Sequence, residues 1–459
     1  MVLAHPSGPG GRARRIRRAA AALAGAAALT LGAAACTGSA GGAQGGTGSS
    51  SAPVTITFWH GWSQPNELKA IDANIAAFEK LHPTIKVKSV GNMSDDKIDQ
   101  GLRAGGPNSP DVVSSFTTNN VGKFCSSGAW IDLAPFLRKD GVDPASTFPK
   151  AMLDYTRYKG DQCSLPLLGD AYGLYYNVDM FKAAGISAPP RTLSQFDADA
   201  VKLTKANSSG GYSQLGFMPD FHGYETTFEH YAAQWGPSWF TPAGKSNLAG
   251  DPGFARMLAW QKGLIGKLGG FQKLEKERTS FGDEFSSNPF DDGKTAMSMD
   301  GEWRVANLTQ EHVGFHWATA PFPVPDDQAS SYGRGYQTGT IVGISHNSRH
   351  QAAAWEFVKY LTTDTDALTG FANAIDNVPS TYAALRSPKL KLPPQFRTFL
   401  EVAGDRYSDT TPASPNGGAY LTSAENFGYQ VESGKVTDVP AGLRKTDQQI
   451  DADLAQAGQ

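Results

Sequence analysis

An alternation of strand and helix patterns, starting at residue 54, limits the possible folds of this chain more than any other feature. Residues 54–59 form an apolar, β-branched run of the kind found in buried strands. Residues 66–82 follow with apolar side chains at helical spacing. A strand pattern at 85–90, a polar helix pattern at 94–104 and a strand pattern at 110–115 come next. Because strands joined through helices usually pair in parallel, this order predicts an α/β fold with a mostly parallel sheet.

Further elements are predicted along the rest of the chain. Strand patterns occur at residues 171–177, 295–299, 313–319 and 340–344, and helix patterns at residues 179–184 and 351–361. Residues 213–260 are rich in aromatic side chains, and we expect this stretch to be mostly helical. The chain has 459 residues, which is enough for several domains of about 100–200 residues each.

Residues 1–35 are predicted to be an export signal. Five arginines precede residues 19–31, which are apolar except for Thr30. A basic segment followed by a short apolar stretch is typical of a secretory signal, and the stretch is too short to span a membrane. The small residues that follow and Cys36 resemble the lipobox of bacterial lipoproteins, in which the cysteine carries lipid, although Ala33 stands where the lipobox prefers Leu. The alternative is an ordinary signal that is cut at an Ala-x-Ala site near Cys36.

Residues 36–53 are predicted to be a flexible tether. They are rich in Gly, Ser and Ala and carry no charged side chain. A tether between an acylated Cys36 and a folded body suits a protein that is held by lipid at the outer face of the cell membrane. We expect the lipid to be its one contact with the membrane, because the sequence holds no run of 18 apolar residues.

The charge distribution makes a nucleic-acid partner unexpected. The formal net charge is −3, but residues 1–35 hold five arginines and neither Asp nor Glu, so the rest of the chain is near −8. Proteins that bind nucleic acids usually show a basic excess or a basic face.

The cysteine count agrees with export. Of the three cysteines, Cys125 and Cys163 remain as a possible pair if Cys36 carries lipid. An oxidising exterior permits a disulfide across this separation of 38 residues. Two buried free thiols are the alternative.

Short segments spread over residues 54–385 carry a more specific signal. They are Ile56–His60, Phe78–Val87, Pro110–Val113, Pro166 with Tyr172–Asn177, Phe181–Ile186 with Pro189–Thr192, Phe290–Met297, Gly301–Trp303, Ala354–Leu361 and Val378–Ser380. In this order they resemble segments of the extracellular solute-binding proteins of sugar importers, the family that includes the maltose/maltodextrin-binding proteins. The resemblance implies a receptor that binds a sugar or oligosaccharide and delivers it, as a monomer, to the permease subunits of an ABC importer.

The same resemblance implies an α/β fold of the two-lobed periplasmic-binding-protein type II, in which ligand lies in a cleft between the lobes. In this family the chain crosses the hinge between the lobes more than once, and the resemblance implies the same here. We expect these crossings near residues 167–171, near residues 332–340 and just before Val378. The implied division gives residues 54–168 and 335–377 to the first lobe and residues 169–334 and 378–459 to the second lobe.

Sugar recognition requires flat aromatic rings for the C–H faces of the sugar and planar polar groups for its hydroxyls. Ligands of α/β sheets lie beyond the carboxyl ends of the strands, where His60, Gln64, Ser115 and Thr118 are expected. The resemblance adds Asp170, which aligns with an acidic ligand contact, and Gly301 with Trp303, which match a Gly-x-Trp loop whose Trp stacks on sugar. The remaining candidates are Tyr172, Tyr224, Trp235, Asp300 and Tyr336.

Neither a metal nor a cofactor is expected. The pairs His312/His316 and His346/His350 have metal-like spacing, but no further ligand completes either set. Two alternative functions remain open. The same fold could bind glycerol phosphate through Arg334, or a secreted glycoside hydrolase could use two carboxylates from a set of four. These are Asp170, Asp291, Asp292 and Glu302. Since no hydrolase motif is present, we expect a binding protein and not an enzyme.

Overall fold

A computed structural model describes residues 53–106, 109–221, 223, 225–281 and 288–458 of the chain. The predicted export signal, the predicted tether up to residue 52, Cys36 and Tyr224 lie outside the described residues. Among the residues that are described, no helix is both long enough and apolar enough to cross a membrane.

The first part of the fold confirms the predicted alternation of strands and helices. Its elements are β1 (Val54–Trp59), α1 (Pro65–Leu81), β2 (Ile85–Val90), α2 (Asp95–Ala104), β3 (Val112–Ser115), α3 (Asn120–Ser126), α4 (Ala134–Lys139), α5 (Pro144–Thr147) and α6 (Lys150–Asp154). Helix α1 buries one side, which includes Ile71, Ile75 and Phe78. Its opposite side places Lys69, Asp72 and Lys80 in solvent. Its apolar spacing therefore determines both where the helix forms and which side packs on the sheet.

A second group of elements follows the long strand β4 (Ser164–Asn177). They are α7 (Val178–Ala183), α8 (Leu193–Leu203), β5 (Lys205–Ala206), β6 (Tyr212–Gln214), α9 (Phe228–Ala232), α10 (Pro252–Lys267), α11 (Phe271–Ser280), β7 (Met297–Gly301), α12 (Trp303–Glu311), β8 (Trp317–Ala320) and the 3₁₀ helix η1 (Asp326–Ser331). The last part holds β9 (Gln337–Ile344), α13 (Gln351–Thr363), α14 (Thr365–Ile375), β10 (Val378–Pro379), α15 (Tyr382–Leu385), η2 (Pro394–Phe396), α16 (Arg397–Gly404), α17 (Ala419–Glu432) and α18 (Val439–Ala457).

The prediction of a mostly parallel sheet is wrong. The strand order is β10-β4-β9-β3-β1-β2, and β7 and β8 also pair with β4. Only the pairs β1–β2 and β1–β3 of this sheet are parallel among the described strands. The local order predicted those two pairs, but β9 returns from far along the chain and runs antiparallel between β3 and β4.

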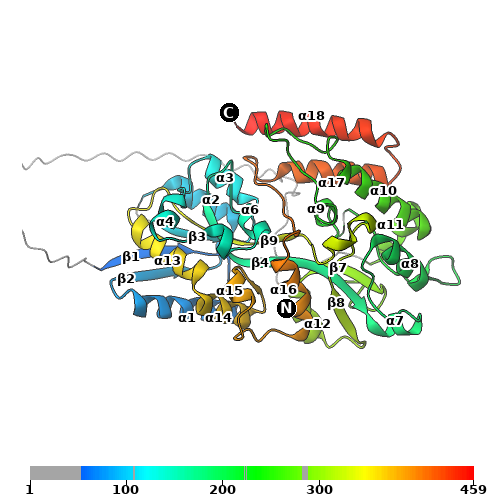
Figure 1. Cartoon of the computed structure of the whole chain (residues 1–459), viewed down its shortest axis with the longest axis horizontal. Helices are drawn as coiled ribbons and strands as arrows, with labels where there is room; N and C mark the ends of the chain where they lie inside the picture. The colour runs from blue at the N-terminus through cyan, green and yellow to red at the C-terminus, as the bar shows by residue number, and fades with distance from the viewer. Residues whose placement is uncertain (1–52, 107–108, 222, 224, 282–287, 459) are drawn as a thin grey trace, which may run out of the picture. The chain divides into compact units, whose positions relative to one another are not determined.

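Strand β4 belongs to two different pairings, and Figure 1 shows it running between them. Its first half, up to Ala171, pairs with β9, and its second half, from Tyr172, pairs with β7 and β8. The close approach to β9 requires glycine at position 339, where φ is +157° and a Cβ would lie 2.3 Å from the Leu168 carbonyl oxygen. The pairing partners of β4 therefore change at Ala171–Tyr172.

Two large buried clusters lie on either side of this change. One packs β1, α1, α13 and α14 around Phe58, Phe78 and Phe357. The other packs α8, α9, α10 and α17 around Phe196 and Phe228. Strand β4 contributes to both, through Leu165–Leu168 to the first and through Leu174 to the second. The lobe boundaries that were expected from the sequence stay a prediction.

The predicted helical stretch at 213–260 is wrong in most of its length. Among the described residues of this stretch, the regular elements are the strand β6, the short helix α9 and the first part of α10. Pro219, Pro237 and Pro242 interrupt the stretch, and proline supplies no N–H to a helix. Its aromatic side chains are instead held by tertiary packing in the second cluster. Residues 295–299 and 313–319 do lead into strands, at β7 and β8.

Cys125 and Cys163 form a disulfide that joins α3 to the residue before β4. Their Cα atoms lie 5.8 Å apart, which is within the usual range for a disulfide.

Candidate functional site

Four ring-bearing side chains meet where β4 changes its pairing partners. The ring centroid of Tyr172 lies 4.0 Å from that of His230 and 5.5 Å from those of both Trp303 and Tyr336. The His230 and Tyr336 centroids are 4.7 Å apart. Because these residues are on β4, on α9, at the start of α12 and just before β9, only the tertiary fold brings them together. We refer to these four residues as the aromatic cluster.

Three members of the aromatic cluster were predicted as ligand contacts, but His230 was not. A single histidine in an irregular, aromatic-rich stretch gives no sequence signal. In the structure its Nδ1 lies 2.9 Å from the carbonyl oxygen of Glu225, and burial lowers its pKa to about 4. The imidazole is therefore neutral at neutral pH and packs as an aromatic ring between Tyr172 and Tyr336.

The loop that carries Trp303 is shaped by Gly301. A Cβ at position 301 would lie 2.2 Å from the Trp303 ring, so only glycine lets the indole fold back over the end of β7. The Gly301 carbonyl accepts a hydrogen bond of 2.7 Å from the hydroxyl of Tyr175. The Gly-x-Trp pattern thus has a steric cause in this structure.

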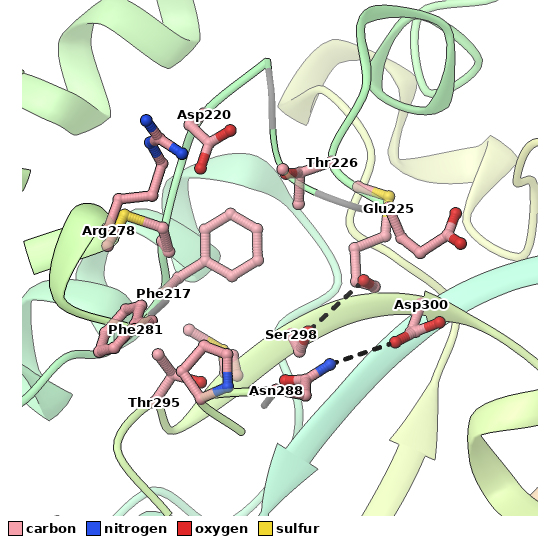
Figure 2. Close-up of a pocket in the computed structure, with 15 residues that line it drawn as sticks. Phe217, Asp220, Glu225, Thr226, Arg278, Phe281, Asn288, Thr295, Ser298 and Asp300 are labelled. Atoms are coloured by element: carbon pink, nitrogen blue, oxygen red, sulfur yellow. Dashed lines mark hydrogen bonds between the residues drawn. The ribbon is translucent and has the colours of Figure 1, made fainter. Parts of the chain in front are cut away.

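A pocket of about 90 Å³, drawn in Figure 2, reaches the aromatic cluster through its lining residue Glu225. Its lining combines aromatic rings with carboxylates, an amide, hydroxyls and a guanidinium. The labelled lining residues are Phe217, Asp220, Glu225, Thr226, Arg278, Phe281, Asn288, Thr295, Ser298 and Asp300. Glu225 connects the pocket to the aromatic cluster, since its Oε2 is 3.7 Å from Nδ1 of His230. These are the group types that polyhydroxy ligands require.

Asp300 lines this pocket and is held by protein donors. One oxygen accepts from Nε of Arg304 at 2.8 Å, and the other accepts from the Gly301 N–H at 2.8 Å. Arg304 also donates to Asp291 at 2.7 Å. Burial raises the pKa of Asp300, and it raises the pKa of Asp291 to about 7. Asp300 therefore fixes the start of α12 at one wall of the pocket.

Two of the predicted contacts from the first part of the chain, His60 and Ser115, are buried and have partners within the protein. His60 has none of its surface exposed, its Nε2 lies 2.8 Å from the Ser89 hydroxyl, and burial lowers its pKa to about 4. Ser115 donates to Asp95 at 2.8 Å and accepts from the Thr117 N–H at 3.0 Å.

Thr118 and Gln64 are also tied to the protein. The Thr118 hydroxyl lies 3.0 Å from the hydroxyl of Thr338, which joins the loop after β3 to β9. Gln64 is half-buried at the start of α1, where its N–H donates to Glu67 at 2.8 Å. Asp170 lies on β4 two residues before Tyr172. The side-chain amide of Asn377 lies 3.4 Å from an oxygen of Asp170 and 3.1 Å from an oxygen of Glu302.

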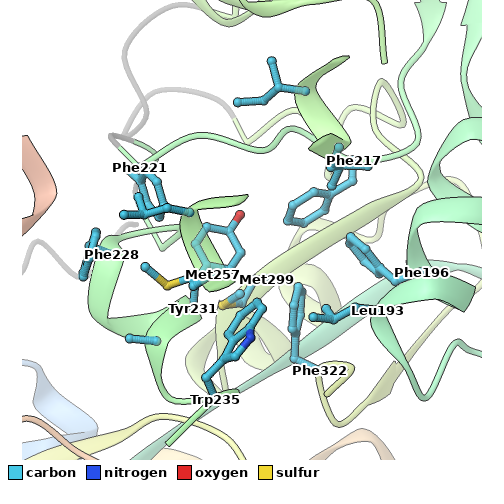
Figure 3. Packing of buried hydrophobic residues seen from close by; sticks show 14 of the residues in the cluster. Leu193, Phe196, Phe217, Phe221, Phe228, Tyr231, Trp235, Met257, Met299 and Phe322 are labelled. Atoms are coloured by element: carbon cyan, nitrogen blue, oxygen red, sulfur yellow. The ribbon is translucent and has the colours of Figure 1, made fainter. Parts of the chain in front are cut away.

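Trp235 lies in the core of the second large cluster. Its ring centroid is 5.5 Å from that of Trp260, and Figure 3 shows it among other buried side chains such as Tyr231 and Phe322. Trp235 and His60 are both buried, as are Tyr172 and Tyr336 of the aromatic cluster, and whether Trp235 or His60 contacts a ligand stays a prediction. Trp235 is packed among the apolar side chains of the second large cluster, and the His60 ring lies next to those of Phe58 and Trp62. Tyr224 lies outside the described residues.

No group of three His, Cys, Asp or Glu side chains that could hold a metal occurs in the part of the chain that the structure describes. The two histidine pairs singled out by their spacing do not form such a group.

Comparisons with known proteins agree with this fold. Residues 61–367 match the family model described as bacterial extracellular solute-binding protein. A maltotriose-binding protein of Pyrococcus abyssi is 20% identical over 399 residues, which cover 86% of this chain and 81% of that protein. The structure of CpMnBP1 with mannotriose bound is 25% identical, with a TM-score of 0.68, and the match covers 86% of this chain and 99% of that one.

A further solved structure, the sugar-binding protein MalE from the phytopathogen Xanthomonas citri, is 21% identical with a TM-score of 0.72. The match covers 88% of this chain and 98% of that one. These likenesses show the two-lobed α/β fold that the sequence segments implied. The chain belongs to the family of bacterial extracellular solute-binding proteins.

Proposed function

We propose that this protein binds a sugar or oligosaccharide at the aromatic cluster and the adjoining pocket, and delivers it to an ABC importer. The observation that carries the proposal is the meeting of Tyr172, Trp303 and Tyr336 beside a pocket with carboxylate and amide groups. Aromatic faces pack on sugar C–H groups, and carboxylates accept from sugar hydroxyls. The likeness to the maltotriose-binding relative and to the mannotriose complex supports this ligand class.

Binding acts through the relative position of the two lobes. A ligand that contacts both lobes stabilises the closed arrangement by its differential affinity for that arrangement. The closed form would then dock on the permease subunits. No chemical reaction takes place, so the site requires geometry and not an activated nucleophile.

A glycoside hydrolase is disfavoured by the contacts of its four candidate carboxylates. Such an enzyme needs two free carboxyl groups about 5–10 Å apart across a sugar. Asp170 and Glu302 are hydrogen-bonded to one another. Asp291 pairs with Arg304 at 2.7 Å, and Asp292 pairs with Lys294 at 3.0 Å.

Glycerol phosphate is a weaker candidate ligand, because the arginine that was expected to bind its phosphate already has partners within the protein. Arg334 was the expected anion contact, but its guanidinium donates to the Tyr407 carbonyl and to the Gln328 side chain, both at 3.0 Å. It is also nearly buried, with 9% of its surface exposed. Its donors already serve to hold the segment before β9.

A thermal-shift and calorimetry series tests the proposed ligand class. Maltotriose, mannotriose and glycerol 3-phosphate are each added to the purified protein. A ligand present at 100 times its Kd stabilises the native state by about 2.7 kcal/mol. We expect a shift with at least one of the sugars and none with glycerol phosphate. A shift with glycerol phosphate alone would refute the sugar assignment.

We also propose that Cys36 carries lipid and that residues 36–53 tether the body to the outer face of the membrane. Replacing Cys36 by Ala should release the protein from membrane fractions into the medium. Retention of the variant in washed membranes would contradict the anchor, whereas the sugar-binding proposal would stand.

A further inference from the structure

One face of strand β1 is open at the end where the described chain begins. Thr55 and Thr57 point to the face opposite the first large cluster, because side chains alternate along a strand. At the far end of this face α2 covers Trp59, since a Cβ at Gly101 would lie 2.3 Å from the indole ring. Thr55 is exposed and Thr57 is half-buried, so the first half of the face is left uncovered.

A hollow of about 600 Å³ lies over these two threonines, and we refer to it as the β1 hollow. Thr55 and Thr57 form its floor, and the turn at residues 345–350, between β9 and α13, forms one wall. This turn contributes three basic side chains, those of His346, Arg349 and His350. All three are exposed, and none takes part in an ion pair among the described residues.

Asp111 is the one carboxyl group in the described lining, and protein donors occupy it. One of its oxygens accepts from the Thr57 N–H at 2.8 Å, and the other accepts from the Ser348 hydroxyl at 2.5 Å. These bonds join the floor to the wall. The β1 hollow is therefore preorganised for a ligand.

Strand β2 adds a further cation to the same face. Lys88 is directly opposite Thr57 in the parallel pair β1–β2, so both side chains point to one side of the sheet. Lys88 is exposed and forms no ion pair among the described residues. Its neighbour Lys86, in contrast, pairs with Glu79 at 2.9 Å. Lys88 and Arg349 thus give the rim two unpaired cations.

The β1 hollow also lies where the predicted tether joins the body. The tether ends at residue 53, and Thr55 of the floor follows two positions later. After residue 35 the chain carries a net charge near −8, so an anionic membrane surface repels the body as a whole. A face that rests on such a surface must therefore be locally basic.

We propose that the β1 hollow binds phosphate groups, and that these are the headgroup phosphates of anionic lipids in the membrane that carries the tether. Guanidinium, ammonium and imidazole groups and hydroxyls donate to phosphate oxygens. The inference rests on the proposed tether in one respect, namely that residue 53 is the end of the body nearest the membrane.

This contact adds to the lipid, which the sequence predicted as the one contact with the membrane. A short flexible tether keeps the body at a high effective concentration beside the surface, so a weak site is sufficient. The contact holds the body with the start of β1 toward the membrane.

A matched pair of double variants tests the site, each made in a Cys36→Ala protein that cannot carry lipid. Lys88→Gln with Arg349→Gln removes two cations from the rim of the hollow. Arg444→Gln with Lys445→Gln removes the same charge from exposed positions on α18 and is the control. Because all four side chains are exposed, we expect both variants to fold.

Cosedimentation with vesicles in low-salt buffer gives the direct readout. The vesicles contain phosphatidylglycerol and phosphatidylcholine in equal parts, or phosphatidylcholine alone. We expect the Cys36→Ala protein to bind the anionic vesicles only, the rim variant to bind them about 30-fold more weakly, and the control to bind like its parent. Equal binding by the rim variant and the control would overturn the proposal, as would absence of binding by the Cys36→Ala protein.

Inorganic phosphate distinguishes the two sources of the same chemical group. Proton NMR follows the ring signals of His346 and His350, assigned by replacing each with Gln, while phosphate is added at constant ionic strength. We expect phosphate to shift both signals and to displace the protein from anionic vesicles. A shift with phosphate but no vesicle binding would overturn the membrane contact and assign the hollow to a soluble phosphate.

Salt separates this contact from the proposed lipid anchor, because it screens exposed charges but leaves an acyl chain in place. Release of the Cys36→Ala protein from membranes by a concentrated salt wash supports the β1 hollow, whereas retention after that wash would contradict the anchor. Sugar titration of the rim variant should give the affinity of its parent. Absence of sugar binding by the parent would contradict the proposed ligand class and leave the vesicle result unchanged.

Discussion

The imidazole ring of His230 packs on the phenol ring of Tyr172, with a centroid distance of 4.0 Å and an angle of 37° between the planes. This contact joins α9 to β4 at the point where β4 exchanges β9 for β7 and β8 as its partners. The neutral imidazole suits this position, because burial removes the hydration that a charged ring requires and lowers the pKa of His230 to about 4.

We predict that His230 makes the fold sensitive to acid. Burial lowers its pKa from 6.5 to about 4 in the native state. The unfolded state therefore binds the proton first, and stability that is present above pH 6.5 is lost as the pH falls toward 4. The loss from this residue is about 3 kcal/mol at pH 4. Urea unfolding at pH 7 and pH 4.5 should show a smaller loss for His230→Gln than for the parent protein. Replacing the exposed His346 by Gln should leave the loss unchanged.

We predict the opposite pH dependence for Glu432. Its carboxyl group accepts from Gln261 at 2.9 Å and from the Phe221 N–H at 3.2 Å, and burial followed by the charge of Asp220 raises its pKa from 4.5 to about 9. The native state therefore retains a proton that the unfolded state releases, so stability falls as the pH rises from 4.5 toward 9. At pH 7 the loss from this group is about 3 kcal/mol. Glu432→Gln should be less destabilised between pH 5 and pH 8 than the parent, as measured by urea unfolding. A parallel decline in both proteins would contradict the assignment.

We predict that Trp303→Ala weakens sugar binding by about 1–3 kcal/mol, which is roughly 5- to 150-fold, because the indole face is lost. Calorimetric titration measures the change, and Trp303→Phe should lie between the variant and the parent protein. Tyr407→Ala, which removes an exposed ring, is the control and should bind normally. Unchanged affinity in a folded Trp303→Ala protein would exclude this ring from the site.

We predict that the disulfide contributes about 3–4 kcal/mol to the free energy of unfolding, because it closes a loop in the unfolded chain. The bonded residues are 38 positions apart. Replacing both Cys125 and Cys163 by Ser should lower the stability by this amount, and reducing the parent protein before denaturation should give the same value. A parent protein that is equally stable with and without reductant would contradict the prediction.

Local elements with strong periodicity were predictable from the sequence. The patterns at 54–59, 66–82 and 85–90 correspond to β1, α1 and β2 within a residue or two. Each of these elements follows from the spacing of its own apolar side chains. The helix prediction for residues 213–260 was wrong, because distant partners fix the aromatic side chains there. The spacing of these side chains carries no helical signal. The antiparallel pairing of β9 with β3 and β4 was missed for a related reason, since it depends on segments more than 100 residues apart.

In the candidate site, too, some residues could be predicted from the sequence and others could not. Tyr172, Trp303 and Tyr336 could be chosen from their types and from the family resemblance, and the structure places them together. His230, Glu225 and Asn377 could not be chosen, because none of them lies in a segment with a signal of its own. Whether those chosen residues contact a ligand stays a prediction.

The amino-acid sequence by itself determined the main strands and helices of the first part, the excess of negative charge after residue 35, and the family to which the chain belongs. These properties depend on residue types and on short spacings. Tertiary structure alone decided that His60 and Trp235 are buried, that His230 joins the aromatic cluster, and that Asp170 meets Glu302. The physical reason is that burial and charge interactions depend on which distant segments come into contact, and desolvation shifts a pKa only after those contacts exclude water.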